Sequence, residues 1–196
     1  GAVVTAVIQS SSATTVMVVG FVNAGIMTLN QAVGVIMGAN IGTTMTAFLI
    51  SLNLTSIAPI AVFIGVGLIF FSKRKAVKSF GEILVGFGIL FMGMDFMTQS
   101  MVPLRDNEGF HRIITSVSNP VLGVLAGTIM TVVLQSSSAA VGILQALAAQ
   151  GLIGLDGAIF ILFGQNIGTC VTAILASMGT NTNAKRAAFI HFAIKT

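Results

Sequence analysis

The sequence has no tryptophan, no tyrosine and only one cysteine, and charged residues are scarce. Charged residues make up 7% of its 196 residues. A soluble domain has about 25%, because its surface has to face water. Intrinsic disorder is also excluded, since it requires little apolar sequence and this chain is 55% apolar. The composition therefore predicts a protein embedded in a membrane.

These scarcities exclude further features. The single cysteine, Cys170, cannot form an internal disulfide. Without Trp and Tyr, the chain lacks the aromatic belt that usually marks the two membrane interfaces. The net charge of +4 does not indicate nucleic-acid binding, because six of the nine basic residues lie in two short segments that are typical of orienting membrane loops: Lys73, Arg74, Lys75 and Lys78, then Lys185 and Arg186.

Two parts of the chain share one sequence pattern. GAVVTAVIQSSSA at residues 1–13 matches GTIMTVVLQSSSA at residues 127–139. GANIGTTMTAFLIS at residues 38–51 matches GQNIGTCVTAILAS at residues 164–177. Both matches have the same offset of 126 residues and contain no gap. Two polar motifs at one offset are hard to produce by chance, so the sequence predicts an internal duplication.

Each copy is expected to contain a hairpin and an interrupted helix. The apolar arms around each QSSS tip are shorter than the roughly 20 residues that span a bilayer, which predicts re-entrant hairpins at residues 1–25 and 119–151. The entry arm of the first hairpin is short, and the natural chain is expected to begin before it. The segments 30–51 and 156–178 are long enough to span but contain Gly-x-Asn-Ile-Gly-Thr, which predicts a broken helix facing protein or water.

The predicted fold is an all-α membrane protein of two inverted-topology repeats. Repeat 1 takes residues 1–117 and includes spanning helices at 57–72 and 80–102. Repeat 2 takes residues 118–196, is truncated, and ends in the start of a further helix at 187–196.

Counting crossings predicts the orientation of the two repeats. Three crossings separate the hairpins, and an odd number gives them opposite orientations. This count, made without reference to charge, places Lys73 to Lys78 and Lys185 with Arg186 on one side. An excess of Lys and Arg marks the cytoplasmic side. We therefore expect a multi-pass protein of a plasma membrane or bacterial inner membrane.

Inverted repeats with paired broken helices are typical of secondary transporters, with the binding site near the middle of the membrane. The tips place hydroxyl and amide groups beside half-helix N-termini, which attract anions, while freed carbonyls and side-chain oxygens suit sodium. No Lys or Arg lies within either motif. An oxyanion there would need a cation from solution, which favours sodium coupling. The alternative is that Ser, Thr and Gly serve only helix packing.

The doubled QSSS, each followed by Gly-x-Asn-Ile-Gly-Thr, resembles the sodium:phosphate cotransporter family, which includes the type II carriers of animal epithelia and bacterial homologues. The resemblance covers essentially the whole chain and implies sodium-coupled symport of inorganic phosphate. The two copies differ at Thr14 and Ala140 and at Thr44 and Cys170, so they are not expected to be equivalent ligand by ligand. The resemblance implies these residues for phosphate and sodium binding: Gln9, Ser10, Ser11, Ser12, Asn40, Thr43, Gln135, Ser136, Ser137, Ser138, Asn166 and Thr169.

Other polar residues have weaker claims. Asp95 lies within a predicted span, where a carboxylate is a functional candidate, and Asp95 and Thr44 are candidates for sodium coupling. His111 is expected at the surface of a charged loop. His191 lacks a carboxylate to complete a triad with a serine, so no enzyme activity is expected. Lys195 is interpreted as lying at a chain end rather than within the membrane.

We therefore expect inorganic phosphate, sodium and the lipid bilayer as partners, with Na⁺ as the coupling ion, no cofactor and no nucleic acid. Homo-oligomer formation stays open. One alternative keeps the architecture and carries another oxyanion or a small carboxylate with sodium or protons. Another is a channel or a structural membrane subunit, which saturable uptake against a gradient would exclude.

Overall fold

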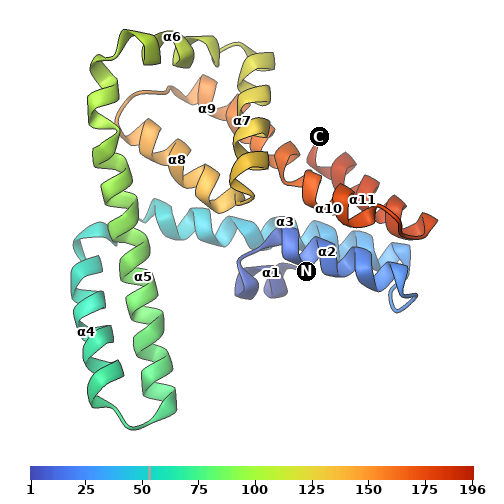
Figure 1. The fold of residues 1–196 in the computed structure, drawn as a ribbon, viewed down its shortest axis with the longest axis horizontal. Coiled ribbons are helices and arrows are strands. Elements are labelled where there is room, and N and C mark those ends of the chain that lie inside the picture. The colour runs from blue at the N-terminus through green and yellow to red at the C-terminus, as the bar shows by residue number, and fades with distance from the viewer. Residues whose placement is uncertain (53) are drawn as a thin grey trace.

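The structure, a computed structural model, describes residues 1–52 and 54–196, without the side chains of residues 105, 111 and 115. The expected surface role of His111 lies outside this description. Throughout the described part, the regular structure is helical. The elements are α1 (Ala2–Ile8), α2 (Ser11–Asn23), α3 (Leu29–Ser51), η1 (Leu54–Ser56), α4 (Ala58–Phe71), α5 (Lys75–Ser100), η2 (Val102–Asp106), α6 (Glu108–Ser116), α7 (Pro120–Leu134), α8 (Ser137–Ala149), α9 (Leu155–Gly168), α10 (Cys170–Ser177) and α11 (Thr182–Lys195) (Figure 1).

Among the described residues, three helical stretches are long and apolar enough to cross a membrane. They are Leu29–Ser51, Lys75–Leu104 and Leu155–Ser177. The arms of the second hairpin, α7 and α8, have 15 and 13 residues, so each is too short to span alone, as the sequence predicts. The all-helical, membrane-type fold class is therefore confirmed, while re-entry into a bilayer stays a prediction.

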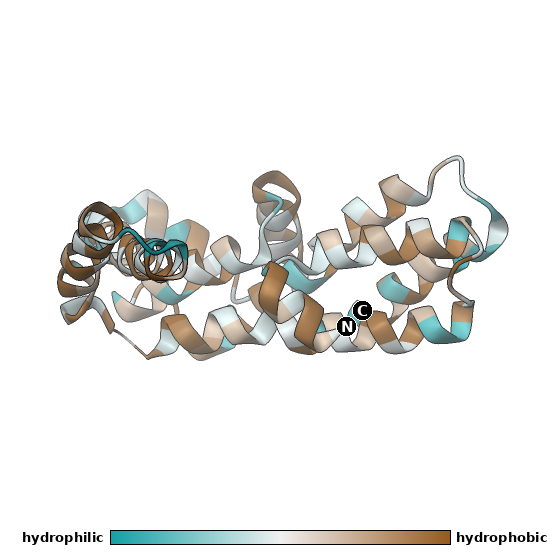
Figure 2. Cartoon of the chain, turned by 90° about the horizontal axis from the view of Figure 1, so that it is seen from below, coloured by the Kyte–Doolittle hydropathy of each residue, from teal (hydrophilic) through white to brown (hydrophobic). Residues whose placement is uncertain are grey.

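Helices α4 and α5 form an antiparallel hairpin that projects from the rest of the molecule (Figure 1). Its helices approach closely at Gly65 and Gly81, where an added Cβ would lie 2.7 Å from the other glycine's carbonyl oxygen. Three phenylalanines point outward: Phe63, Phe70 and Phe71 are 82%, 79% and 92% exposed. Figure 2 shows this part of the chain, at the left, as largely hydrophobic. An apolar surface of this kind is suited to lipid.

The α4–α5 hairpin lies crosswise to α3 in Figure 1. Helices that lie crosswise do not share one bilayer normal in this arrangement. The crossing count, which treats these helices as successive spans, therefore stays a prediction.

The two repeats pack by the same glycine contacts. An added Cβ on Gly1 would lie 2.0 Å from the carbonyl oxygen of Val35, and one on Gly127 would lie 2.0 Å from that of Ile161. These pairs correspond at the offset of 126 residues. Helix α1 thus packs on α3 as α7 packs on α9, backbone against backbone.

The expected break in the segment 30–51 is wrong, because α3 continues through the motif without interruption. In the segment 156–178 only Thr169 separates α9 from α10, and its φ of −66° and ψ of −17° are helical values. The glycines explain the difference. A Cβ added to Gly42 would lie 2.7 Å from the Thr5 side chain, and one added to Gly168 would lie 2.8 Å from the Thr131 side chain. These glycines therefore permit close helix packing and do not break the helices.

The last helix begins earlier than predicted. α11 starts at Thr182, because Asn181 caps it by accepting a hydrogen bond from the Ala184 amide at 2.9 Å. Lys185 and Arg186 therefore lie inside its first turns and not in a preceding loop.

The largest buried cluster joins the two repeats. It lies between α2, α3, α10 and α11, and Asn181 reinforces it by bonding Asn23 twice, each time at 2.9 Å. Its buried members are Val18, Val19, Val22, Ala32, Ile36, Ala173, Ala184, Ala187 and Ala188. The small side chains let the four helices approach closely.

Candidate functional site

The two QSSS tips have the same backbone geometry. Gln9 and Gln135 have φ values of 59° and 53°, which non-glycine residues seldom adopt. The amide of each glutamine folds back and donates to a carbonyl three residues earlier, in both cases at 2.6 Å. Each glutamine therefore forms the turn itself, and such conformations are concentrated at functional sites.

The first serine of each tip caps the helix that follows. Ser10 accepts from the Ala13 amide at 3.1 Å, and Ser136 accepts from the Ala139 amide at 3.2 Å. The cap satisfies one of the amides that a helix start leaves without an intrahelical partner. The next two serines occupy the first turn, where backbone N–H groups and the helix dipole favour an anion.

A cavity of about 370 Å³ brings several predicted residues together. Asn40, Thr43 and Thr44 come from α3, while Ser137 and Ser138 come from the start of α8. The remaining lining residues are Asn166 from α9, Lys195 from α11, and the apolar Ala47, Val141 and Ile194. The cavity therefore combines the helix of the first repeat with the tip of the second.

The threonines on α3 present acceptor oxygens. Thr43 donates its hydroxyl proton to the Ala39 carbonyl at 2.8 Å, and Thr44 donates to the Ile41 carbonyl at 2.7 Å. A hydroxyl that donates in this way keeps its lone pairs for another partner. The buried Oδ1 of Asn40 has no hydrogen-bond partner in the described chain. This side of the cavity thus offers oxygen ligands for a cation.

The other predicted residues lie elsewhere. Gln9 accepts a hydrogen bond from the Thr46 hydroxyl on α3, and Ser11 is buried, with its carbonyl accepting from Thr15 at 2.8 Å. Thr169 is buried and donates to the Asn166 carbonyl at 2.7 Å. Of the residues predicted to bind phosphate and sodium, those that do not line the cavity in the described structure are Gln9, Ser10, Ser11, Ser12, Gln135, Ser136 and Thr169.

Thr46 links the two tips indirectly. It holds Gln9 and also lines a shallow apolar groove of about 350 Å³ with Ser138 and Ala139. The first tip thus reaches one side of α3, and the second tip reaches the same helix through this groove. That both tips face one binding site stays a prediction.

The cavity has one fixed positive side chain, which neither motif supplies. Lys195 lines the cavity, and its Nζ donates to Asn166 Oδ1 at 3.3 Å. Lys195 is 29 residues from Asn166 in sequence and lies outside both motifs, so the motifs alone do not predict it at the cavity. The sequence feature that could have indicated Lys195 is its position after a largely apolar stretch, residues 187–194.

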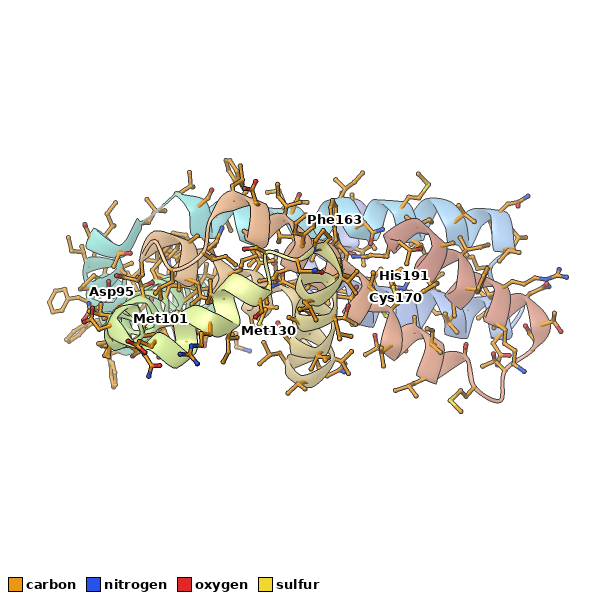
Figure 3. All side chains as sticks on the ribbon, turned by 90° about the horizontal axis from the view of Figure 1, so that it is seen from above. Asp95, Met101, Met130, Phe163, Cys170 and His191 are labelled. Atoms are coloured by element: carbon orange, nitrogen blue, oxygen red, sulfur yellow. The ribbon has the colours of Figure 1, made fainter. Side chains whose placement is uncertain are left out.

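Asp95 occupies a second cavity, also about 370 Å³, with Ser51, Thr98 and Gln145 among its lining residues. Its Oδ2 accepts a hydrogen bond from Gln99 Nε2 at 2.6 Å. Figure 3 shows Asp95 near one end of the molecule, well away from Cys170 and His191, which lie together where α10 meets α11. Of the two sodium-coupling candidates, Thr44 lies in the first cavity and Asp95 in the second.

The donor set decides which ions fit. Within the described part of the chain, no three His, Cys, Asp or Glu side chains gather to hold a metal ion. The first cavity instead offers hydroxyl and amide oxygens with one ammonium. Such ligands suit a hard cation beside an oxyanion, and they do not suit zinc or another soft metal.

Comparison with known proteins adds independent information. A sequence model of the family described as "Na+/Pi-cotransporter" matches residues 1–99 and 103–196. The chain is 33% identical over 190 residues to "Uncharacterized protein YqeW" of Bacillus subtilis, covering 96% of this chain and 62% of that protein. It is 32% identical over 188 residues to "Putative inorganic phosphate export protein YjbB" of Escherichia coli, covering 94% of this chain and 34% of that protein.

The similarity extends to an animal protein over a shorter stretch. "Sodium-dependent phosphate transport protein 2A" of Rattus norvegicus is 39% identical over 74 residues, which are 36% of this chain and 12% of that protein. The chain spans 62% of the length of the Bacillus relative and 34% of that of the Escherichia relative. No solved structure is significantly similar to this chain.

Proposed function

Because the chain belongs to the Na⁺/Pi-cotransporter family, we propose that it is the membrane core of a secondary transporter that carries inorganic phosphate together with sodium. One observation carries the proposal beyond the family. The start of α8, with Ser137 and Ser138, shares a cavity with the oxygen-rich face of α3. An anion-binding helix start beside a set of cation ligands is what coupled binding of phosphate and sodium requires.

In this proposal the two ions bind to different walls of the cavity. Phosphate accepts hydrogen bonds from the first-turn amides and hydroxyls of Ser137 and Ser138. Sodium is bound by oxygens of Asn40, Thr43 and Thr44 on the facing wall. Each ion offsets the other's charge in a site of low dielectric, so each raises the affinity for the other.

The residues outside the cavity complete the proposal. Gln9, Ser10, Ser11 and Ser12 form the equivalent tip of the first repeat and take part when the repeats exchange roles in alternating access. The proposed membrane orientation is inverted between repeats, with Lys73 to Lys78 and Lys185 with Arg186 in the cytoplasm. The opposite directions of α3 and of α9–α10 in Figure 1 support the inversion.

The second cavity gives Asp95 a separate part in the proposal. Its carboxylate lies with hydroxyls and with Gln145, whose buried Oε1 has no hydrogen-bond partner in the described chain. A carboxylate with neutral oxygens around it is a ligand set for a coupling cation. Asp95→Asn should then reduce sodium affinity while leaving phosphate affinity at saturating sodium unchanged.

The direct test is uptake of radiolabelled phosphate into proteoliposomes containing the full-length protein. We expect an inward sodium gradient to drive uptake, and Ser137→Ala to lower uptake at least about tenfold, because a charge-assisted hydrogen bond to phosphate contributes more than about 1.4 kcal/mol. Ser100→Ala is the matched control, since Ser100 is exposed at the end of α5. Uptake that ignores the sodium gradient would contradict the coupling.

Two other candidate functions follow from specific observations. The name of the Escherichia relative indicates export, so the same carrier could run outward when the gradients are reversed. Efflux from preloaded vesicles tests this direction.

The neutral hydrogen-bond donors of the cavity are also suited to binding other oxyanions or small carboxylates. Competition for uptake by sulfate, arsenate or a dicarboxylate would reveal such a cargo.

A further inference from the structure

The two equivalent asparagines of the repeats have different partners. Asn166 Oδ1 accepts a hydrogen bond from the Lys195 ammonium at 3.3 Å. Asn40, its counterpart 126 residues earlier, has a buried Oδ1 without a partner in the described chain. Both residues line the same cavity. The cavity therefore has a built-in cation on one wall and an open set of oxygens on the other.

The Lys195 ammonium has no acidic side chain beside it among the described residues that line the cavity. An amide oxygen satisfies one of the three donors of a lysine but does not neutralise it. A partly buried charge without an opposite charge is costly, so the site gains free energy when an anion enters.

We propose that Lys195 is a tethered cation of the anion site, which takes the place of one sodium ion next to Asn166. This rests on the proposed function and adds to it. Bound oxyanion is held between the Lys195 ammonium and a sodium ion at Asn40, Thr43 and Thr44. Each transported phosphate then needs one sodium fewer than it would in a site whose two walls were both lined only by neutral oxygens.

The test compares Lys195→Gln, which removes the charge, with Lys195→Arg, which keeps it. Labelled sodium and labelled phosphate fluxes are measured together in proteoliposomes containing the full-length protein. We expect Lys195→Gln to carry one more sodium ion per phosphate than the wild type. Its half-saturating phosphate concentration should rise about tenfold at low sodium and approach the wild-type value at high sodium, since solution cations then replace the ammonium.

Lys185→Gln is the matched control. Lys185 lies on the same helix but borders a different pocket, with Ile174, Ala188 and Phe189 among its lining residues. We expect this variant and Lys195→Arg to keep the wild-type flux ratio. Size-exclusion chromatography establishes that each variant is folded.

Failure of the Lys195 proposal and failure of the proposed cotransport give different results. If the wild type couples phosphate to sodium and Lys195→Gln keeps the wild-type flux ratio and phosphate affinity at low sodium, the tethered cation is wrong and the cotransport stands. If the wild type shows no sodium-driven phosphate uptake, the proposed function fails. Binding of labelled phosphate to the purified protein then decides about Lys195: a loss of about tenfold in Lys195→Gln supports it, and unchanged binding overturns it.

Discussion

A single substitution between the repeats changes how buried polar atoms are satisfied. In the first repeat Thr5 donates to Thr14 at 2.9 Å. In the second repeat Ala140 stands at the position of Thr14, and the buried hydroxyl of Thr131 has no partner in the described chain. Gln165, which stands where the first repeat has Ala39, donates instead to the Ala140 carbonyl at 3.0 Å. The sequence comparison found the difference at Ala140 but did not predict the contact with Gln165, because Gln165 is the variable residue of the Gly-x-Asn-Ile-Gly-Thr motif.

This exchange predicts coupling between positions 140 and 165. Gln165→Ala alone should destabilise the protein by about 2 kcal/mol, because it removes a buried hydrogen bond and leaves a cavity. Adding Ala140→Thr should recover about 1 kcal/mol, since it recreates the arrangement of the first repeat around Thr131. Thermal unfolding in detergent measures the two single variants, Gln165→Ala and Ala140→Thr, and the double variant. Strictly additive effects of the two changes would contradict the coupling.

Among the helices, glycine permits close packing in α3 and α9, the two helices that contain the Gly-x-Asn-Ile-Gly-Thr motif. Gly and Asn within α3 and α9 predict broken helices by their propensities. Propensity is a weak guide when tertiary contacts act against it, and here the neighbouring helices α1 and α7 occupy the space that a Cβ would need. The hairpin arms and the α4 and α5 segments were predictable within a few residues, because apolar length and polar interruptions define them. The packing role of the glycines was not, since it depends on a partner helix.

Packing of this kind predicts a sharp contrast between glycines. Gly164→Ala should destabilise the protein by about 3 kcal/mol, because the new Cβ would lie 2.0 Å from the Val124 carbonyl oxygen. Gly86→Ala on α5 should stabilise by up to about 1 kcal/mol, since nothing lies within 4 Å of its Cβ and alanine favours helix. Loss of folded protein on heating in detergent compares the two. Equal effects would show that α7 and α9 are not in close contact.

At the scale of the whole molecule, the site depends on residues that are far apart in the sequence. The motif residues Asn40, Ser137, Ser138 and Asn166 were predictable as a group, because a duplicated polar pattern in apolar sequence stands out. Lys195 was not, since only the packing of α11 against α10 and α3 brings it to the cavity. Charge along the chain predicts orientation, but it does not determine which basic residue lines the cavity.

The orientation itself can be tested by labelling. In a Cys170→Ser background, Lys78→Cys and Lys185→Cys should react with a membrane-impermeant maleimide only from the cytoplasmic side, because basic segments are retained there. Glu108→Cys, at the start of α6, should react only from the opposite side. Vesicles of known sidedness provide the measurement. Labelling of Lys78→Cys and Lys185→Cys from opposite sides would contradict the inverted topology.

The paired contacts between Asn23 and Asn181 bear on how such a molecule can move. Asn23 Oδ1 accepts from the Asn181 main-chain amide, and Asn181 Nδ2 donates to the Asn23 carbonyl, directly beside the buried cluster that α2, α3, α10 and α11 share. Sliding α2 past α11 would break both contacts at once. Joined at their ends in this way, α2 of the first repeat and α11 of the second are expected to move together in any change of conformation.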